Sequence, residues 1–283
     1  MTIVAFAAAA AILFGIGLAL RLRENARRKA YFDAPFPKKW EKILRRDVPV
    51  YAFLPAELRE KFHRRIKEFL AEKTFEACGG LPKISDATAL VIAAGASLLV
   101  INRRGKAWRT LHSVIVYPSA FAAPEGADDS DATDVSGGNG TAVVRRERGR
   151  RDGESWTHGS IVLSHERITR DIAFHGNGQN VVLHEFAHQL DNDDGVRGGR
   201  PKFSDPADAR AWQRVSAREI ERLRSGDPTT VLDEYGAEDA AEFFAVSVEA
   251  FFEKSSAMKR AHPELYALLE RFFALDPASW GYS

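Results

Sequence analysis

Residues capable of metal chemistry lie close together in the stretch 180–191, NVVLHEFAHQLD. His184 and His188 are four positions apart, so on a helix both imidazoles share one face and can bind a single metal ion. Glu185 lies one step round the helix, beside the open coordination position, where a carboxylate acts as general base rather than as ligand. This H-E-x-x-H spacing is typical of zinc peptidases and predicts a single Zn2+ ion in each chain.

The motif needs a helix to hold both histidines on one face. Asn177 or Asn180 can cap such a helix, and apolar residues surround the motif, which predicts that the helix is buried. Buried imidazoles and a carboxylate lose their hydration and need compensation, which a metal ion supplies. Histidines satisfied by hydrogen bonds within a protein core are the alternative interpretation.

A third metal ligand must come from another part of the chain, because a catalytic zinc usually takes three protein ligands and a water. In the longer H-E-x-x-H-x-x-G-x-x-H motif, Asp191 and Asp194 stand where glycine and histidine would be, although Asp194 could in principle bind metal. Better candidates lie in the segment 234–254, EYGAEDAAEFFAVSVEAFFEK. Glu242 and Glu249 sit there among Phe, Val and Ala, where an unpaired carboxylate would be costly. The residues alone leave these two glutamates nearly equal.

The segment HEFAHQLD, followed downstream by a tyrosine and AEFFAVSVEAFF, resembles the Mlc titration factor A family of zinc metallopeptidases, peptidase family M90. The similarity extends over residues 54–280 and includes YPSAF and GSIVLS. The resemblance implies that Glu242 is the third zinc ligand and that Tyr235 assists catalysis. It also implies an α+β fold with a zincin-like metallopeptidase core, similar to the catalytic domain of anthrax lethal factor.

The activity expected from these residues is hydrolysis of peptide bonds by metal-activated water, with a peptide or protein as substrate. Glu185 takes a proton from the water, and the hydroxyl of Tyr235 can donate to the oxyanion. A tyrosine that only packs at the start of a helix is the alternative role for Tyr235. Asp191 and Glu249 are candidates for orienting an imidazole from behind, with helix capping and a surface ion pair as their alternatives.

A binding protein is the second hypothesis for function. The family name implies sequestration of a transcriptional repressor, and zinc would then only stabilise a docking surface. Glu185 favours the enzyme, since a structural zinc site needs no base beside the metal. The repressor is therefore an expected partner by family resemblance alone.

The overall composition is that of an ordinary globular protein. A chain of 283 residues, 45% hydrophobic and 28% charged, can bury a sizeable core. The net charge of +1 gives no indication of a nucleic-acid partner, although a local run of arginines lies within residues 145–151. Cys78 is the only cysteine, which excludes an internal disulfide framework and a cysteine-rich metal site.

The N-terminal residues 2–20, TIVAFAAAAAILFGIGLAL, form an uncharged apolar run just long enough to cross a bilayer as a helix. Basic residues, beginning with Arg21 and Arg23, follow this run rather than precede it, which favours an uncleaved anchor over a signal peptide. By the positive-inside rule the remainder of the chain stays in the cytoplasm. The predicted location is the inner (cytoplasmic) membrane, with a single pass and a cytoplasmic catalytic domain.

Three segments are therefore expected: a transmembrane anchor (1–20), a basic juxtamembrane connector without clear periodicity (21–50), and a zinc metallopeptidase domain (51–283). The predicted fold class is α+β, preceded by one transmembrane helix. An acidic, glycine-rich stretch, 123–140, is expected to form a mobile loop. Within the third segment, periodicity predicts helices over 55–73, 86–100, 205–224, 238–253 and 263–274, and strands over 112–118, 141–147 and 159–166.

Overall fold

The computed structural model describes residues 2–119, 159–193 and 198–282. The chain divides into two compact units, Met1–Glu41 and Lys42–Ser283. The predicted loop 123–140 and the predicted strand 141–147 lie outside the described residues. The sites discussed below all belong to the second unit.

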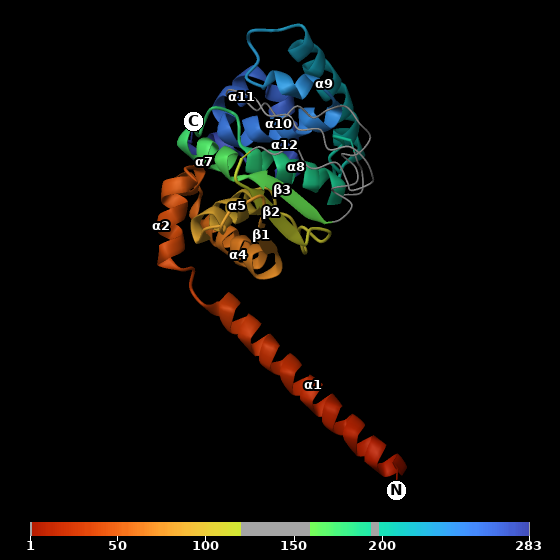
Figure 1. The fold of residues 1–283 in the computed structure, drawn as a ribbon. Coiled ribbons are helices and arrows are strands. Elements are labelled where there is room, and N and C mark those ends of the chain that lie inside the picture. The colour runs from red at the N-terminus through yellow and green to blue at the C-terminus, as the bar shows by residue number, and fades with distance from the viewer. Residues whose placement is uncertain (1, 120–158, 194–197, 283) are drawn as a thin grey trace, which may run out of the picture. The chain divides into compact units, whose positions relative to one another are not determined.

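The first unit consists mainly of one long helix, α1 (Thr2–Asp33) (Figure 1). The prediction of a transmembrane anchor at its start is wrong, because no helix in the described part of the chain is long and apolar enough to cross a membrane. Alanine and glycine fill almost half of residues 2–20 and contribute little to membrane transfer, and the helix continues without interruption into Arg21, Arg23 and Glu24. The predicted single-pass location in the inner membrane depended on that anchor, so this prediction is wrong as well.

Regular structure also occupies much of the segment that was expected to lack periodicity. Two helices, α2 (Lys38–Asp47) and α3 (Val50–Phe53), follow α1. Trp40, Ile43 and Leu44 recur in α2 at helical spacing, a pattern that the prediction of an irregular connector overlooked.

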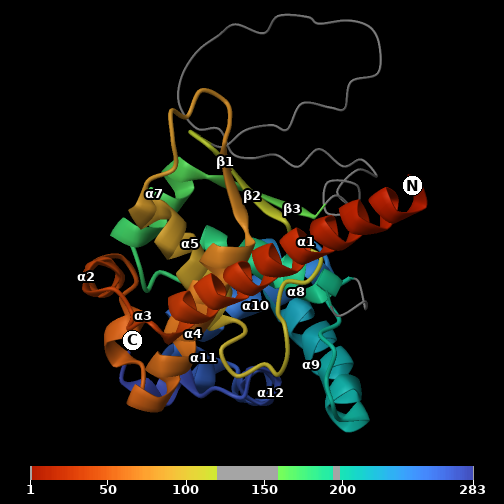
Figure 2. The same cartoon turned by 90° about the horizontal axis from the view of Figure 1, so that it is seen from below.

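The second unit is mostly helical, with a small parallel sheet of three strands in the order β1-β2-β3 (Figure 2). The strands are β1 (Thr74–Ala77), β2 (Ser113–Tyr117) and β3 (Ser160–Ser164). The predicted fold class therefore needs correction from α+β to a mostly helical domain with a parallel sheet. The predictions for β2 and β3 were right, but β1 was missed because its four residues, TFEA, are too few to show a strand period.

Local sequence signals account well for the positions of the helices. Asp205 caps its helix through a bond from the Ala207 N–H to its Oδ1 (2.7 Å), and a proline follows at the first helical position. Asp86 was the predicted cap of the next helix, but Ser85 is the residue that caps it, by accepting the Thr88 N–H. The helices of this unit are α4 (Ala56–Glu72), α5 (Asp86–Leu98), α7 (His165–Ala173), α8 (Val181–Asp193), α9 (Pro206–Arg224), η1 (Glu234–Ala237), α10 (Ala240–Glu253), α11 (Ser255–Ala261), α12 (Pro263–Phe273) and η2 (Pro277–Trp280).

The hydrophobic core fixes the position of α8, the helix that carries the histidine motif. The ring of Phe186 is fully buried, 5.5 Å from the ring of Phe69 and 5.1 Å from that of Trp108. Gly95 in α5 allows a close approach on another side, since a Cβ there would lie 2.5 Å from Cγ1 of Val182. Core packing thus holds α8 by its apolar face and leaves its polar face for the site.

Candidate metal centre

Helices α8 and α10 pack against each other and carry the candidate ligands. The Asn180 side chain caps α8 by accepting the Leu183 N–H at 3.1 Å, as one of the two predicted caps. His184 and His188 then lie on one face of α8, with their rings 4.9 Å apart. Glu242 comes from the first turn of α10, where Asp239 accepts its N–H at 2.9 Å.

Three side-chain donor atoms converge between these two helices. The Nε2 atoms of His184 and His188 are 3.2 Å apart, and Oε2 of Glu242 lies 3.1 Å from the first and 3.4 Å from the second. Ligand atoms at about 2.0–2.1 Å from a tetrahedral zinc ion lie roughly 3.3 Å from one another. The donor set, two imidazoles and a carboxylate, therefore fits zinc in both spacing and chemistry.

The electrostatics of this cluster favour a cation. Burial is the largest influence on the pKa of His184 and lowers it, but hydrogen bonds to the carboxylates of Glu242 and Glu249 outweigh burial and raise that pKa to about 10. The negative field that stabilises a proton on the imidazole would equally stabilise a metal ion. Two ring nitrogens that face each other can share only one proton, whereas both lone pairs can bind one metal ion.

Glu249 lies behind the imidazole rather than at the metal position. Its carboxylate makes a short contact with Nδ1 of His184, and its other oxygen accepts the Asn180 N–H at 2.8 Å. Burial raises the pKa of Glu249. A carboxylate on Nδ1 fixes the ring orientation and leaves Nε2 facing Glu242. The predicted role of orienting an imidazole therefore agrees with this geometry, and the surface ion pair does not.

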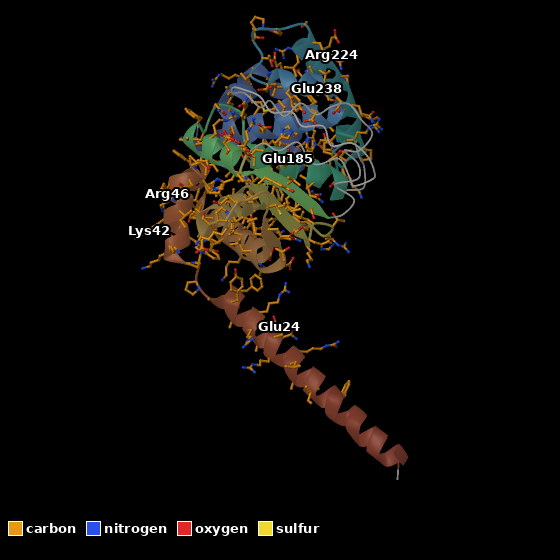
Figure 3. All side chains as sticks on the ribbon, viewed as in Figure 1. Glu24, Lys42, Arg46, Glu185, Arg224 and Glu238 are labelled. Carbon is orange, nitrogen blue, oxygen red and sulfur yellow. The ribbon has the colours of Figure 1, made fainter. Side chains whose placement is uncertain are left out.

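The other two residues expected at the site lie beside the cluster. Glu185 lies on α8 (Figure 3) and is half-buried, and among the described residues its carboxylate has no hydrogen-bond partner. The ring of Tyr235, in η1, is centred 6.1 Å from that of His184. Asp233 holds η1 in place by accepting the Tyr235 N–H at 3.0 Å and the Gln179 side-chain N–H at 2.9 Å. The ring of Tyr235 thus lies near His184, and the charge of Glu185 is among the influences that raise the pKa of His184.

Comparison with known proteins agrees with this geometry. Residues 22–274 match the model of the glucose-regulated metallo-peptidase M90 family. The chain belongs to this family. An uncharacterised protein of Synechocystis sp. is 36% identical over 255 residues, which cover 89% of each chain. Mlc titration factor A of Cronobacter sakazakii is 28% identical over 252 residues, covering 86% of this chain and 88% of its own. Mlc titration factor A of Klebsiella pneumoniae is 28% identical over 246 residues, covering 84% and 86%.

Membership of the M90 family confirms the resemblance inferred from the sequence motifs. It also supports the coarse prediction of a metallopeptidase. The family match does not assign the ligands, the base or the metal of this chain, which rest on the geometry described above.

Two further residues were considered in the sequence, Asp194 as a third ligand and Asp191 as a residue that orients an imidazole. Asp194 lies outside the described residues. Asp191 was expected to orient an imidazole or cap a helix. Its hydrogen bonds come from backbone N–H groups, at 2.8 Å from Gly198, 2.8 Å from Gly199 and 3.1 Å from Arg200, and it also interacts electrostatically with His188. These partners follow Asp191 by several residues, so helix periodicity gave no signal for this contact.

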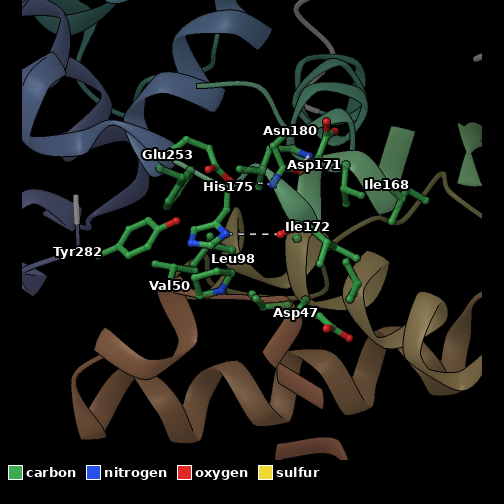
Figure 4. Close-up of a pocket in the computed structure, with 18 residues that line it drawn as sticks. Asp47, Val50, Leu98, Ile168, Asp171, Ile172, His175, Asn180, Glu253 and Tyr282 are labelled. Atoms are coloured by element: carbon green, nitrogen blue, oxygen red, sulfur yellow. Dashed lines mark hydrogen bonds between the residues drawn. The ribbon is translucent and has the colours of Figure 1, made fainter. Parts of the chain in front are cut away.

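A group of buried acids at the start of α8 was also missed by sequence analysis. Asp171 accepts the Val181 N–H at 2.7 Å, and Glu253 accepts the Gly176 N–H at 2.6 Å and the Asn180 side-chain N–H at 2.9 Å. Figure 4 shows Asp171, Asn180 and Glu253 around one pocket. Burial raises the pKa of both carboxyl groups. They satisfy N–H groups at the positive end of α8. The signal was present, because Glu253 lies one turn after Glu249 on the same face of α10.

Proposed function

We propose that this chain is a zinc-dependent peptidase in which His184, His188 and Glu242 hold the metal and Glu185 is the general base. The observation that carries the proposal is the triangle of donor atoms, with sides of 3.1, 3.2 and 3.4 Å. Family membership supports the reaction class. The substrate class is a peptide or protein, because the family is one of peptidases.

The chemistry divides between the metal and the side chains of the chain. When bound, zinc would supply Lewis acidity and lower the pKa of a coordinated water. Glu185 accepts a proton at its carboxylate and later passes it to the leaving amine. Its position beside His184, without a hydrogen-bond partner among the described residues, leaves both oxygens available for this exchange. The hydroxyl of Tyr235 donates a hydrogen bond to the oxyanion that forms at the substrate carbonyl.

Glu249 has a separate role in this proposal. Its contact with Nδ1 of His184 keeps the proton on that nitrogen, so the lone pair of Nε2 remains available for the metal. The bond from the Asn180 N–H ties the same carboxylate to the start of α8. The orientation of the imidazole and the position of the helix are thereby coupled.

A second candidate function is a zinc-stabilised binding protein that sequesters a transcriptional repressor. The observation that favours it is the name Mlc titration factor A, carried by relatives that are 28% identical to this chain. The two candidates differ in what they require of Glu185. Binding needs no proton acceptor beside the metal, whereas hydrolysis does.

The test compares peptide cleavage by the wild type and by Glu185→Gln at matched zinc occupancy. Glutamine keeps the size and hydrogen bonding of the side chain but removes the base, so we expect cleavage to fall about 10²–10⁴-fold with zinc retained. Glu238→Gln is the control, because Glu238 is an exposed glutamate of the same domain and lies outside the ligand cluster (Figure 3). Equal rates in wild type and Glu185→Gln would refute the mechanism. Chelator-insensitive or absent cleavage by the wild type would favour the binding protein.

A further inference from the structure

The C-terminal turn of α8 is attached to a short backbone segment, 198–200, through one buried carboxylate. Asp191 is 4% exposed and accepts three N–H groups from that segment. Both oxygens take part, since Oδ2 binds the N–H of Gly198 and of Gly199, and Oδ1 binds that of Arg200. A buried carboxylate with three backbone donors holds its partners firmly, because losing any one of them exposes charge to an apolar surrounding.

The same segment presses against the first turn of α10. Gly199 has a φ of +73°, and a Cβ there would collide with the carbonyl group of Ala240 and lie 2.7 Å from the N of Ala241. No side chain therefore fits between this backbone and the helix that begins at Ala240. The contact lies immediately before Glu242 in the chain.

Trp212 secures the segment from a third side. Its indole N–H donates to the carbonyl oxygen of Gly199 at 2.9 Å, and the tryptophan is 2% exposed. Its ring is centred 6.1 Å from that of Phe243 and 5.7 Å from that of Phe244, the two residues that follow Glu242. Gly199 is thus fixed to α8 by its N–H, to α9 by its carbonyl and to α10 by direct contact.

We propose that Asp191 and Gly199 form a positioning clamp that sets the separation of α8 and α10 at the candidate metal site, where His184, His188 and Glu242 converge. The clamp rests on the proposed function, because it acts on the distance between Glu242 and the two imidazoles. Neither residue touches a donor atom of the cluster in the contacts described. Since the donor atoms lie 3.1–3.4 Å apart, a displacement of α10 by a fraction of that distance would spoil the geometry for zinc.

A purely structural clamp would lower stability without changing the site of the folded protein. The test must therefore measure the metal binding of the folded protein as well as its stability. Gly199→Ala forces a methyl group against α10 and is the main variant. Gly198→Ala is its matched control, because Gly198 lies in the same segment with a φ of +91°, and no described atom lies within 4 Å of its added Cβ.

The experiment measures, on the full chain, the zinc dissociation constant by chelator competition and the visible absorption spectrum after Co2+ substitution. We expect Gly199→Ala to weaken zinc binding about 10–100-fold and to alter the cobalt spectrum, whereas Gly198→Ala changes affinity about twofold at most. Trp212→Phe keeps the packed ring and removes only the N–H. It is the second variant should Gly199→Ala fail to fold, and we expect a smaller loss in the same direction.

Wild-type zinc affinity and an unchanged cobalt spectrum in folded Gly199→Ala, or in Trp212→Phe if that variant alone folds, would overturn the clamp. Equal weakening by Gly198→Ala would overturn it too, because the contact with α10 would then not matter. Failure of the peptidase proposal gives a different result. If the wild type binds zinc and cleaves no peptide, the activity is refuted while the clamp is still decided by the dissociation constants.

Discussion

Two buried clusters in this domain each combine histidine with glutamate, and they are built on opposite principles. In the first, His262 and Glu219 are each 1% exposed, with Nδ1 2.8 Å from Oε2. Nε2 of His262 accepts the Val231 N–H at 3.3 Å, which leaves the ring proton on Nδ1 to be donated to Glu219. Guanidinium groups from Arg218 and Arg222 donate to the same carboxylate at 2.9 and 2.7 Å. Each acceptor in this cluster faces a donor.

The metal site instead brings three metal-binding atoms together between two helices. Nε2 of His184 faces Nε2 of His188 at 3.2 Å, and Oε2 of Glu242 approaches both. All three atoms belong to side chains that can bind a metal ion, and each lies within 3.4 Å of the other two. The difference teaches that a buried histidine beside a glutamate indicates a metal site where a second imidazole converges on the same pair. In the other cluster, arginine side chains and a backbone N–H complete the hydrogen bonds of the glutamate and the histidine.

The largest effect that separates the two clusters should come from Glu219→Gln. Removing this charge leaves Arg222 beside a neutral partner, and we expect the free energy of unfolding to fall by about 2–3 kcal/mol. The estimate is moderate because Arg218 is 48% exposed and its ion pair is screened by water. Urea unfolding measures the change, and zinc affinity should stay at the wild-type value. Loss of zinc in this variant would contradict the separation of the two clusters.

Glu249→Gln should have a smaller effect, and on the metal rather than the fold. Glutamine cannot supply the charge that holds the proton on Nδ1 of His184, so we expect zinc affinity to fall about 10–100-fold. Glu253→Gln is the matched control on the same helix, because the described hydrogen bonds of Glu253 go to Gly176 and Asn180 and not to His184 or His188. Chelator competition on both variants decides the matter. Equal losses of zinc affinity in the two variants would show that both glutamates act by holding the start of α8 in place, and that the contact of Glu249 with His184 has no separate effect.

The smallest effect concerns pH and belongs to the hydrogen-bonded cluster. Burial raises the pKa of Glu219, but bonds from His262 and Arg218 outweigh it and lower the pKa to about 2, from 4.5 in the unfolded chain. Between these pH values the unfolded chain binds a proton that the folded chain does not. The contribution of the Glu219 carboxylate to the free energy of unfolding is therefore complete above pH 4.5 and is lost as the pH falls towards 2. The stability difference between wild type and Glu219→Gln should therefore shrink in that window. Urea unfolding with chelator present measures it, and a constant difference down to pH 2 would contradict the assignment.

Sequence reasoning succeeded where the determinants are local. The cap at Asn180, the start of a helix at Asp205, the spacing of His184 and His188, and the apolar face of α10 all depend on residues within a few helical turns. Long, strongly periodic helices were therefore predicted close to their observed bounds. The relation of Glu242 to α8 came from family resemblance, since two glutamates of α10 fit the pattern equally well.

The failures have physical causes of two kinds. The membrane anchor was inferred from the number of apolar residues in 2–20, without weighing how little alanine contributes to membrane transfer. The clamp between Asp191 and Gly199 and the acids at Asp171 and Glu253 depend on contacts between separate elements. The spacing of Glu249 and Glu253 on α10 hinted at one of these groups, but the partners of all of them come from other elements and leave no period in the sequence.

The central claim is that His184, His188 and Glu242 together hold a zinc ion. The most direct test is the zinc content of purified full-length protein after dialysis, compared among wild type, Glu242→Ala and Asp194→Ala. We predict that wild type and Asp194→Ala each retain a single ion and that Glu242→Ala loses it. Full zinc in Glu242→Ala together with loss in Asp194→Ala would contradict the claim and move the third ligand to Asp194.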